Sequence, residues 1–203
     1  GEGPVVLVVG IVEDLADQAG PLELARKMQE GVGRLNSVVG NTLAFTRDLH
    51  PKQGTLCLRS FWEDTLRSAT LAEAVPWENQ IPEQATWLGD PDLLRQVAQN
   101  LLQNAIRALE DAEAPRIVLA AVEERLEDQP CWHLTLTDNG CGIPEEALAK
   151  VFDPFFSTFG GGTGLGLAVC HRIIVAHGGL LFIESQRGRG TTVHLRLAAA
   201  SRP

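Results

Sequence analysis

The sequence predicts an α+β protein in which a helical hairpin precedes a sandwich of helices packed on a mainly antiparallel sheet. Three observations predict this class. The first part of the chain carries an apolar repeat with helical spacing, several later segments alternate between apolar and polar residues, and three further segments return to helical spacing. With 203 residues, 44% of them hydrophobic and 21% charged, the chain has the composition of a globular domain with an appendage.

A helical hairpin is expected over residues 1–49. A shorter apolar helix over residues 5–18 comes first, and "HPKQG" at residues 50–54 ends the hairpin as a linker. The second helix carries a heptad seam at alternating spacings of four and three: Leu24, Met28, Gly31, Leu35, Val38, Thr42, Phe45 and Leu49. One hairpin cannot bury so long a seam, so we expect two copies to form a dimeric four-helix bundle.

The second domain is expected over residues 55–203. Apolar alternation predicts strands at 55–60, 85–88, 116–122, 132–138, 179–185 and 191–197. Helical spacing predicts helices at 61–74 and 90–109, and a third that begins near Leu165. These elements predict the sandwich.

A polar stripe runs along the predicted helix 90–109. It consists of Gln96, Asn100, Asn104 and Arg107, at spacings of four, four and three. Glu and Lys are the usual residues of a solvated stripe, whereas Asn is a poor helix former because its amide competes with the backbone. The stripe therefore favours contacts with a polar ligand, and an ordinary solvated face is the alternative.

Two glycine-rich segments indicate ligand contacts. In "TDNGCGIP" at residues 137–144, a single carboxylate stands beside a backbone that can turn sharply and approach a flat ligand, although a tight turn alone is the alternative. "GGGTGLGLA" at residues 160–168 places five glycines within seven residues directly before a helix, where backbone N–H groups can bind an anion. A flexible linker is the alternative there. The aromatic segment "VFDPFFST" at residues 151–158 is expected to anchor this loop.

The overall composition excludes several classes of protein. The net charge of −9 is against a nucleic-acid-binding surface, which needs a basic face. No stretch approaches the ~20 apolar residues of a membrane span. Cysteines 57, 131, 141 and 170 lack metal-ligand spacing and nothing at the N-terminus resembles a signal peptide, so we expect reduced thiols in a cytoplasmic protein.

Five motifs in this order carry a resemblance: the amides of Asn100 and Asn104, then "DNGCG", "FDPFF", "GTGLG" and "GRGTT". From Asp90 to Leu197 the chain resembles the GHKL-type ATP-binding domain of sensor histidine kinases, a Bergerat-type α/β sandwich. The predicted hairpin is similar to the dimerisation helices of these kinases, notably over "RLNSVVGNTLAFTR" at residues 34–47.

The resemblance implies ATP and Mg²⁺ as ligands. Asn104 would ligate Mg²⁺, Asn100 would lie beside the metal and the phosphates, and Arg107 would neutralise phosphate charge; these are the expected catalytic residues. Asp138 would accept from the adenine amino group. The other nucleotide-binding positions that the resemblance implies are Gly140, Gly142, Ile143, Thr163, Gly164, Leu165, Gly166, Leu167 and Thr191.

The resemblance also favours one branch of the superfamily. DNA gyrase and the heat-shock chaperone ATPases carry a glutamate where this chain has Asn100, and an amide cannot take a proton from water. Transfer of the γ-phosphoryl to a protein histidine, and from it to a response regulator aspartate, is therefore expected rather than hydrolysis. A non-catalytic nucleotide-dependent interaction module or pseudokinase is the alternative. The implied partners are a second copy of the chain and a receiver domain, with no nucleic acid and no membrane contact in this segment.

Two positions depart from the family pattern. If Pro4 is the proline that follows the phospho-acceptor histidine by five residues, the acceptor falls before residue 1, and we expect it to be absent from this chain. Phe159 stands where kinases with a short lid often have a lysine that contacts phosphate.

Overall fold

The structure is a computed structural model that describes residues 31, 49–68, 75–126, 128–159 and 162–199. The chain divides into two compact units, residues 1–43 and residues 44–203. Only Gly31 of the first unit is described, as a helical residue. The predicted hairpin and its dimer seam lie outside the described residues apart from Gly31 and Leu49, and they stay predictions.

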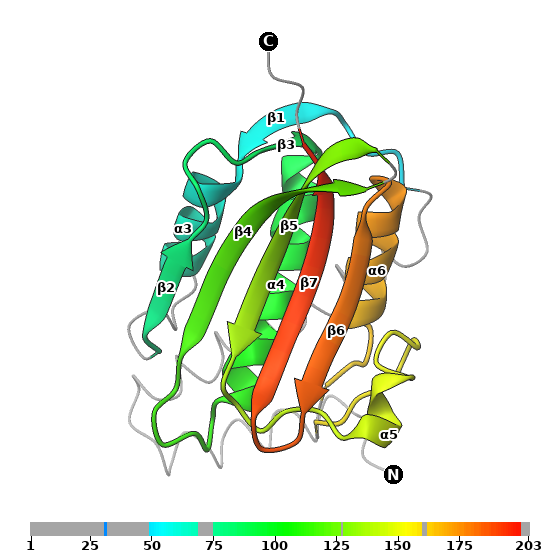
Figure 1. Cartoon of the computed structure of the whole chain (residues 1–203). Coiled ribbons are helices and arrows are strands. Elements are labelled where there is room, and N and C mark those ends of the chain that lie inside the picture. Colours follow the sequence, from blue (N-terminus) through cyan, green and yellow to red (C-terminus); the bar gives the residue numbers. More distant parts are fainter. Residues whose placement is uncertain (1–30, 32–48, 69–74, 127, 160–161, 200–203) are drawn as a thin grey trace. The chain divides into compact units, whose positions relative to one another are not determined.

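A five-stranded sheet forms one layer of the second unit (Figure 1). Neighbouring strands are antiparallel, except that β2 and β4 run parallel. The mainly antiparallel sheet predicted from the alternation is thus confirmed. Its order is β2 (Trp77–Gln80), β4 (Ile117–Leu126), β5 (Gln129–Asp138), β7 (Gly190–Ala198) and β6 (Leu180–Gln186).

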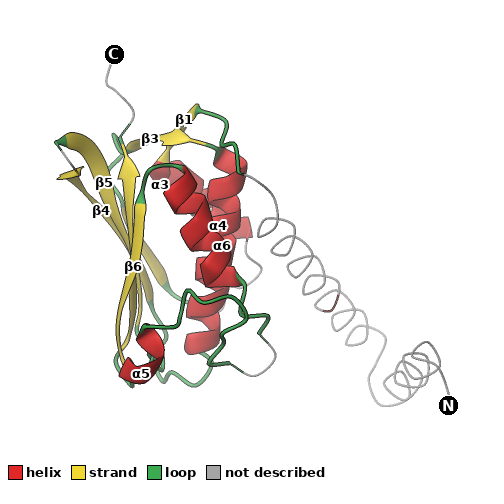
Figure 2. Cartoon of the chain, turned by 90° about the vertical axis from the view of Figure 1, so that its right-hand side faces the viewer, coloured by secondary structure: helices red, strands yellow, loops and turns green. Residues whose placement is uncertain are grey.

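Helices cover one face of this sheet (Figures 1 and 2). They are α3 (Leu58–Ser68), α4 (Pro91–Ala108) and α6 (Gly166–Ala176). Along β5, Leu134 and Leu136 are buried in the core that these helices share with the sheet, whereas the intervening side chains on the opposite face are only half-buried. None of the three helices covers that opposite face.

Helix α4 is held at its start by Asp90. The carboxylate accepts the backbone N–H of Asp92 at 3.0 Å and of Leu93 at 3.3 Å, and a proline at the first helical position suits this cap. The N–H of Asp90 donates to Nε2 of His177 at 3.1 Å, which ties α4 to the end of α6. The helix predicted over residues 90–109 is confirmed.

The strand predicted over residues 55–60 is wrong beyond Cys57. Strand β1 (Gly54–Cys57) pairs with β3 (Thr86–Gly89) in a separate two-stranded sheet, and α3 begins at the next residue. The reason is that Leu58 opens a buried helical period continued by Phe61, Trp62 and Leu66.

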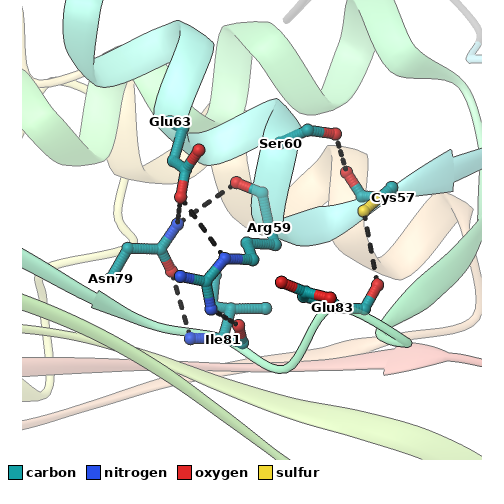
Figure 3. Close-up of polar contacts among 7 residues, drawn as sticks. All are labelled: Cys57, Arg59, Ser60, Glu63, Asn79, Ile81 and Glu83. Atoms are coloured by element: carbon teal, nitrogen blue, oxygen red, sulfur yellow. Dashed lines mark hydrogen bonds and ion pairs between the residues drawn. The ribbon is translucent and has the colours of Figure 1, made fainter.

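Side-chain contacts fix this early start of α3 (Figure 3). Arg59 Nη1 donates to the carbonyl of Ile81 at 2.7 Å, and Asn79 Nδ2 donates to the carbonyl of Arg59 at 3.2 Å and to Glu63 Oε1 at 3.3 Å. Asn79 belongs to β2, a strand that the polar segment "WENQ" did not predict. The short helix α5 (Glu145–Leu148), which lies beside β6, was not predicted either.

Candidate functional site

Asp138, at the end of β5, is a buried carboxylate with 4% of its surface exposed. Its Oδ1 accepts the backbone N–H of Gly140 at 2.9 Å, and the N–H of Thr191, its register partner on β7, also donates to it. Burial raises the pKa of Asp138, against these two hydrogen bonds, which lower it. The group is therefore a desolvated acceptor with lone pairs to spare for a donor.

The turn after Asp138 requires glycine. Gly142 has φ +67°, and a Cβ there would overlap the carbonyl oxygen of Gln186 on β6. The N–H of Cys141 donates at 2.9 Å to the carbonyl of Ala108, in the last turn of α4. This bond brings the carboxylate turn beside the helix that carries the polar stripe.

Ser185 on β6 also belongs to the candidate site. Its Oγ accepts the N–H of Ile143 at 2.8 Å, donates to the carbonyl of Gly190 at 2.8 Å and lies 3.0 Å from Thr191 Oγ1. One hydroxyl thus joins the turn to the β6–β7 hairpin. Sequence reasoning missed this serine, and no motif in the sequence pointed to it.

Asn100 is the buried member of the polar stripe of α4. Asn100 is 7% exposed, hydrogen-bonds the thiol of Cys170 and lies against the start of α6, where a Cβ on Gly166 would stand 3.4 Å from its Oδ1. The solvated-face alternative is therefore wrong for Asn100. Burial raises the pKa of Cys170 to about 12, so this thiol stays protonated.

Asn104 and Arg107 continue the stripe as half-buried residues. Neither side chain has a hydrogen-bond or ion-pair partner within the described ranges, in contrast to Gln96 and Asn100. Arg107 reaches the glycine loop, since its Nη1 would stand 3.5 Å from a Cβ on Gly162. The stripe thus offers an amide and a guanidinium at the edge of that loop.

The glycine loop leads into α6 through a constrained turn. Gly164 has φ +65°, a Cβ there would overlap the backbone of Phe155, and its carbonyl accepts the N–H of Phe155 at 2.9 Å. Phe155 itself has φ +67° and is 75% exposed. The aromatic segment therefore contacts the loop, as expected, through backbone rather than through its ring.

The other predicted nucleotide-binding positions of the glycine loop lie just before α6 or in its first turn. The N–H of Leu165, one of the implied nucleotide-binding positions, donates to Thr163 Oγ1 at 3.3 Å. Leu165 is buried, and Gly166 and Leu167 form the first turn of α6. The N–H groups of that turn have no intrahelical partner, as at any helix start.

The predicted residues fall into two groups joined by α4. One group surrounds Asp138 at the ends of β5, β6 and β7, and the other brings α4 to the glycine loop. The helix-covered antiparallel sheet with its two glycine turns defines the class of this domain: it is a GHKL-type α/β sandwich.

Comparison with known proteins gives the family. Residues 89–201 match the family described as Histidine kinase-, DNA gyrase B-, and HSP90-like ATPase. The signal transduction histidine-protein kinase AtoS of Escherichia coli is 31% identical over 201 residues, covering 96% of this chain and 32% of AtoS. Sensor histidine kinase ZraS of Escherichia coli is 33% identical over 182 residues, covering 86% of this chain and 37% of ZraS. The chain spans about a third of the length of these relatives.

A solved structure agrees with this assignment. The catalytic domain of histidine kinase ThkA is 26% identical, with a TM-score of 0.62 over 73% of this chain and 96% of that one. The chain belongs to the histidine kinase-, DNA gyrase B- and HSP90-like ATPase family, and its GHKL catalytic domain is similar to those of sensor histidine kinases. That domain is an ATP-binding domain. Across the described ranges, no helix combines the length and the apolarity needed to cross a membrane.

Proposed function

We propose that this chain binds MgATP between Asp138 and the glycine loop and transfers the γ-phosphoryl to a protein histidine. The observation that carries the proposal is the pairing of a buried acceptor at Asp138 with two side chains of α4, Asn104 and Arg107, that have no partner among the described residues. A site with one apolar-shielded acceptor and a cationic, glycine-rich end suits a nucleotide, because base and phosphates need opposite surroundings.

Asp138 would read the adenine base. Its carboxylate retains lone pairs after accepting from Gly140 and Thr191, and a donor amino group would satisfy them. Because Gly142 has no side chain, the adenine ring could approach the backbone of the turn closely. Ile143, held by Ser185, would supply apolar contact beside it.

The stripe of α4 and the glycine loop would hold the phosphates. Arg107 provides a guanidinium fork for phosphate oxygens, and the N–H groups at Gly164 and Gly166 can turn toward an anion at the start of α6. The Leu165 amide and Thr163 would join them once the hydrogen bond between these two residues opens.

Mg²⁺ fits this site only together with the nucleotide. In the described part of the chain, no group of three or more His, Cys, Asp or Glu residues could hold a metal ion. Mg²⁺ takes hard oxygen ligands and is commonly bound by one or two protein groups plus phosphates and waters. The amide oxygen of Asn104 is the ligand we propose, with Asn100 as its buried neighbour one turn earlier.

Phosphoryl transfer rather than hydrolysis follows from Asn100. Its amide is engaged with Cys170, and it cannot accept a proton from water. The catalytic contribution of the site is therefore positioning and charge neutralisation, which serve any nucleophile that reaches the γ-phosphate. We propose a histidine of the dimerisation helix as that nucleophile, a response regulator aspartate as the final acceptor, and a homodimer through the hairpin of residues 1–49. We place the protein in the cytoplasm.

The test is phosphoryl transfer from γ-labelled ATP in the presence of Mg²⁺. A chain joined to a segment with a histidine five residues before Pro4, followed by an acid, should acquire an acid-labile, base-stable label. The Asn104→Ala variant should not, whereas Gln103→Ala, at the exposed neighbouring position, should match the parent. The parent chain itself should remain unlabelled; stable labelling lost in His50→Ala would contradict the position assigned to the acceptor. Binding without any transfer would instead support the nucleotide-dependent interaction module.

A further inference from the structure

Five side chains form a connected row on the face of the sheet opposite the helices. They come from four of the five strands, β4, β5, β6 and β7, and they are Glu124, His133, Glu184, His194 and Arg196. The nucleotide site does not use any of them. Two of them are histidines whose rings contact one another.

The contacts along the row run through both nitrogens of each histidine ring. His133 Nδ1 lies 2.9 Å from Glu124 Oε1, and His133 Nε2 lies 3.0 Å from His194 Nδ1. His194 Nε2 lies 3.6 Å from Glu184 Oε2. At the other end, Arg196 Nε lies 3.2 Å from Glu124 Oε2. The pair of imidazoles is thus placed between two carboxylates.

A count of protons shows that the row is incomplete. A carboxylate only accepts, so each outer ring nitrogen must carry a proton to bond its glutamate, and the contact between the rings needs one proton more. Two neutral imidazoles carry only two of these three protons. Satisfying both carboxylates and the ring–ring contact together therefore requires one additional proton on the pair.

The distances identify the contact that lacks its proton. Keeping the two short contacts means that Nδ1–H of His133 donates to Glu124 and Nδ1–H of His194 donates to Nε2 of His133. Nε2 of His194 is then a bare lone pair. It is indeed buried without a hydrogen-bond partner among the described residues, and it faces Glu184 at the longest of the three distances.

We propose that Nε2 of His194 is a proton-binding site, and that its protonation draws the Glu184 carboxylate into a hydrogen bond. The histidine pair then works as a one-proton switch on this face of the sheet. Glu184 can move because 73% of its side chain is exposed, whereas the side chain of His194 is only 11% exposed. The proton cancels the excess negative charge of the row, because Arg196 and Glu124 already balance one another.

The surroundings set the pH range of the switch. The ring of Phe182 stacks on His194 with 4.4 Å between centroids and 3° between planes, which shields the histidine from water. Burial is the main reason that the pKa of His194 is lowered, and the positive charge of Arg196 acts in the same direction, while Glu184 opposes them. Protonation should therefore occur below about 6.5, the ordinary value for histidine.

Nitrogen-15 NMR of the imidazole rings tests the proposal directly on the whole chain. At pH 7.5 both His133 and His194 should be in the Nδ1–H tautomer, whereas a free histidine favours Nε2–H. On acidification, Nε2 of His194 should take up the proton with a midpoint below about 6.5. The assignment would be overturned if His194 were the Nε2–H tautomer at pH 7.5, or if its titration midpoint lay at or above about 6.5.

Two glutamate variants separate the role of Glu184 from a general charge effect. Glu184→Gln should lower the titration midpoint of His194 further, because the Glu184 carboxylate is the group that favours the charged ring. The side chain of Glu184 is exposed, so we expect the variant to fold like the parent. Glu83→Gln removes the same charge at an exposed position in the loop between β2 and β3, and should leave the midpoint unchanged. Equal midpoints in the parent and Glu184→Gln would show that Glu184 is not the moving partner.

Discussion

The hydroxyl oxygen of Ser185 accepts the backbone N–H of Ile143 at 2.8 Å, and it thereby joins strand β6 to the turn that follows Asp138. The same oxygen donates to the carbonyl of Gly190, beside Thr191, whose N–H reaches the carboxylate of Asp138. The carboxylate and the turn are thus held in one network centred on a residue that no motif marks.

Ser185→Ala should weaken both the fold and the nucleotide site. Removing the hydroxyl leaves the part-buried N–H of Ile143 without its partner, and loss of a typical intramolecular hydrogen bond costs about 0.5–1.5 kcal/mol. We expect a lower urea midpoint and ATP binding weakened several-fold. Ser60→Ala is the control, because Ser60 is exposed and its hydroxyl bonds locally, to the carbonyl and the thiol of Cys57. Equal losses in the two variants would contradict a specific role for Ser185.

Asp138→Asn should stabilise the nucleotide-free domain while it weakens ATP binding. Burial raises the folded pKa of this carboxyl above its unfolded value, so stability is greatest below the unfolded pKa and is lost as pH rises through the folded one. At pH 7 the buried charge of Asp138 therefore lowers the stability of the folded domain, and the neutral amide of asparagine avoids this loss. Loss of a charged acceptor should weaken ATP binding on the order of 10- to 100-fold. Denaturation at pH 7 that shows the variant to be less stable would contradict this account.

Gly164→Ala should damage the glycine loop more than alanine at a second glycine with a similar backbone conformation damages its own turn. Gly164 and Gly178 have φ of +65° and +69°, so alanine is strained at both, at about 1–3 kcal/mol. A Cβ at Gly164 would also overlap the backbone of Phe155, whereas nothing lies within 4 Å of one at Gly178. We expect Gly164→Ala to show the larger loss of stability and to lose ATP affinity, measured by urea denaturation and calorimetry. Retained affinity would argue that this turn does not shape the phosphate end.

The stability of the domain should fall as pH drops below about 6.5, in part because of His194. Its folded pKa is lowered, so the unfolded chain takes up the proton first, and stability present above the unfolded pKa is lost as pH falls toward the folded one. Urea midpoints at pH 7.5, 6.5 and 5.5 should decline less steeply for His194→Phe, which cannot titrate, than for the parent. Parallel declines would exclude His194 as a contributor.

The sequence could predict those parts of the domain whose local pattern agrees with its tertiary setting. Helix α4 has a cap, a proline at its first position and a helical period, and its bounds are confirmed. The start of α3 was not predictable in the same way, because "TLCLRS" alternates like a strand and only the buried period from Leu58 makes it helical. Strand β2 is polar and depends on its parallel pairing with β4.

The candidate site divides in the same manner. The glycines could be predicted because turns that need a positive φ select glycine, as at Gly142 and Gly164. Asp138 could be predicted because it stands beside the first of these turns. The burial of Asn100 could not, since it follows from the approach of α6 at Gly166. Ser185 and the contact between His133 and His194 depend on the register between strands, which the sequence pattern alone does not give.

Calorimetric titration of the folded chain with ATP, with and without Mg²⁺, tests the central claim most directly. The parent and the Gln103→Ala control should bind MgATP alike. Asp138→Ala should lose affinity in both conditions because it removes the acceptor for the base, whereas Asn104→Ala should lose it chiefly in the presence of Mg²⁺, because it removes a metal ligand. Unchanged affinity for MgATP in both variants would contradict the assignment of the site.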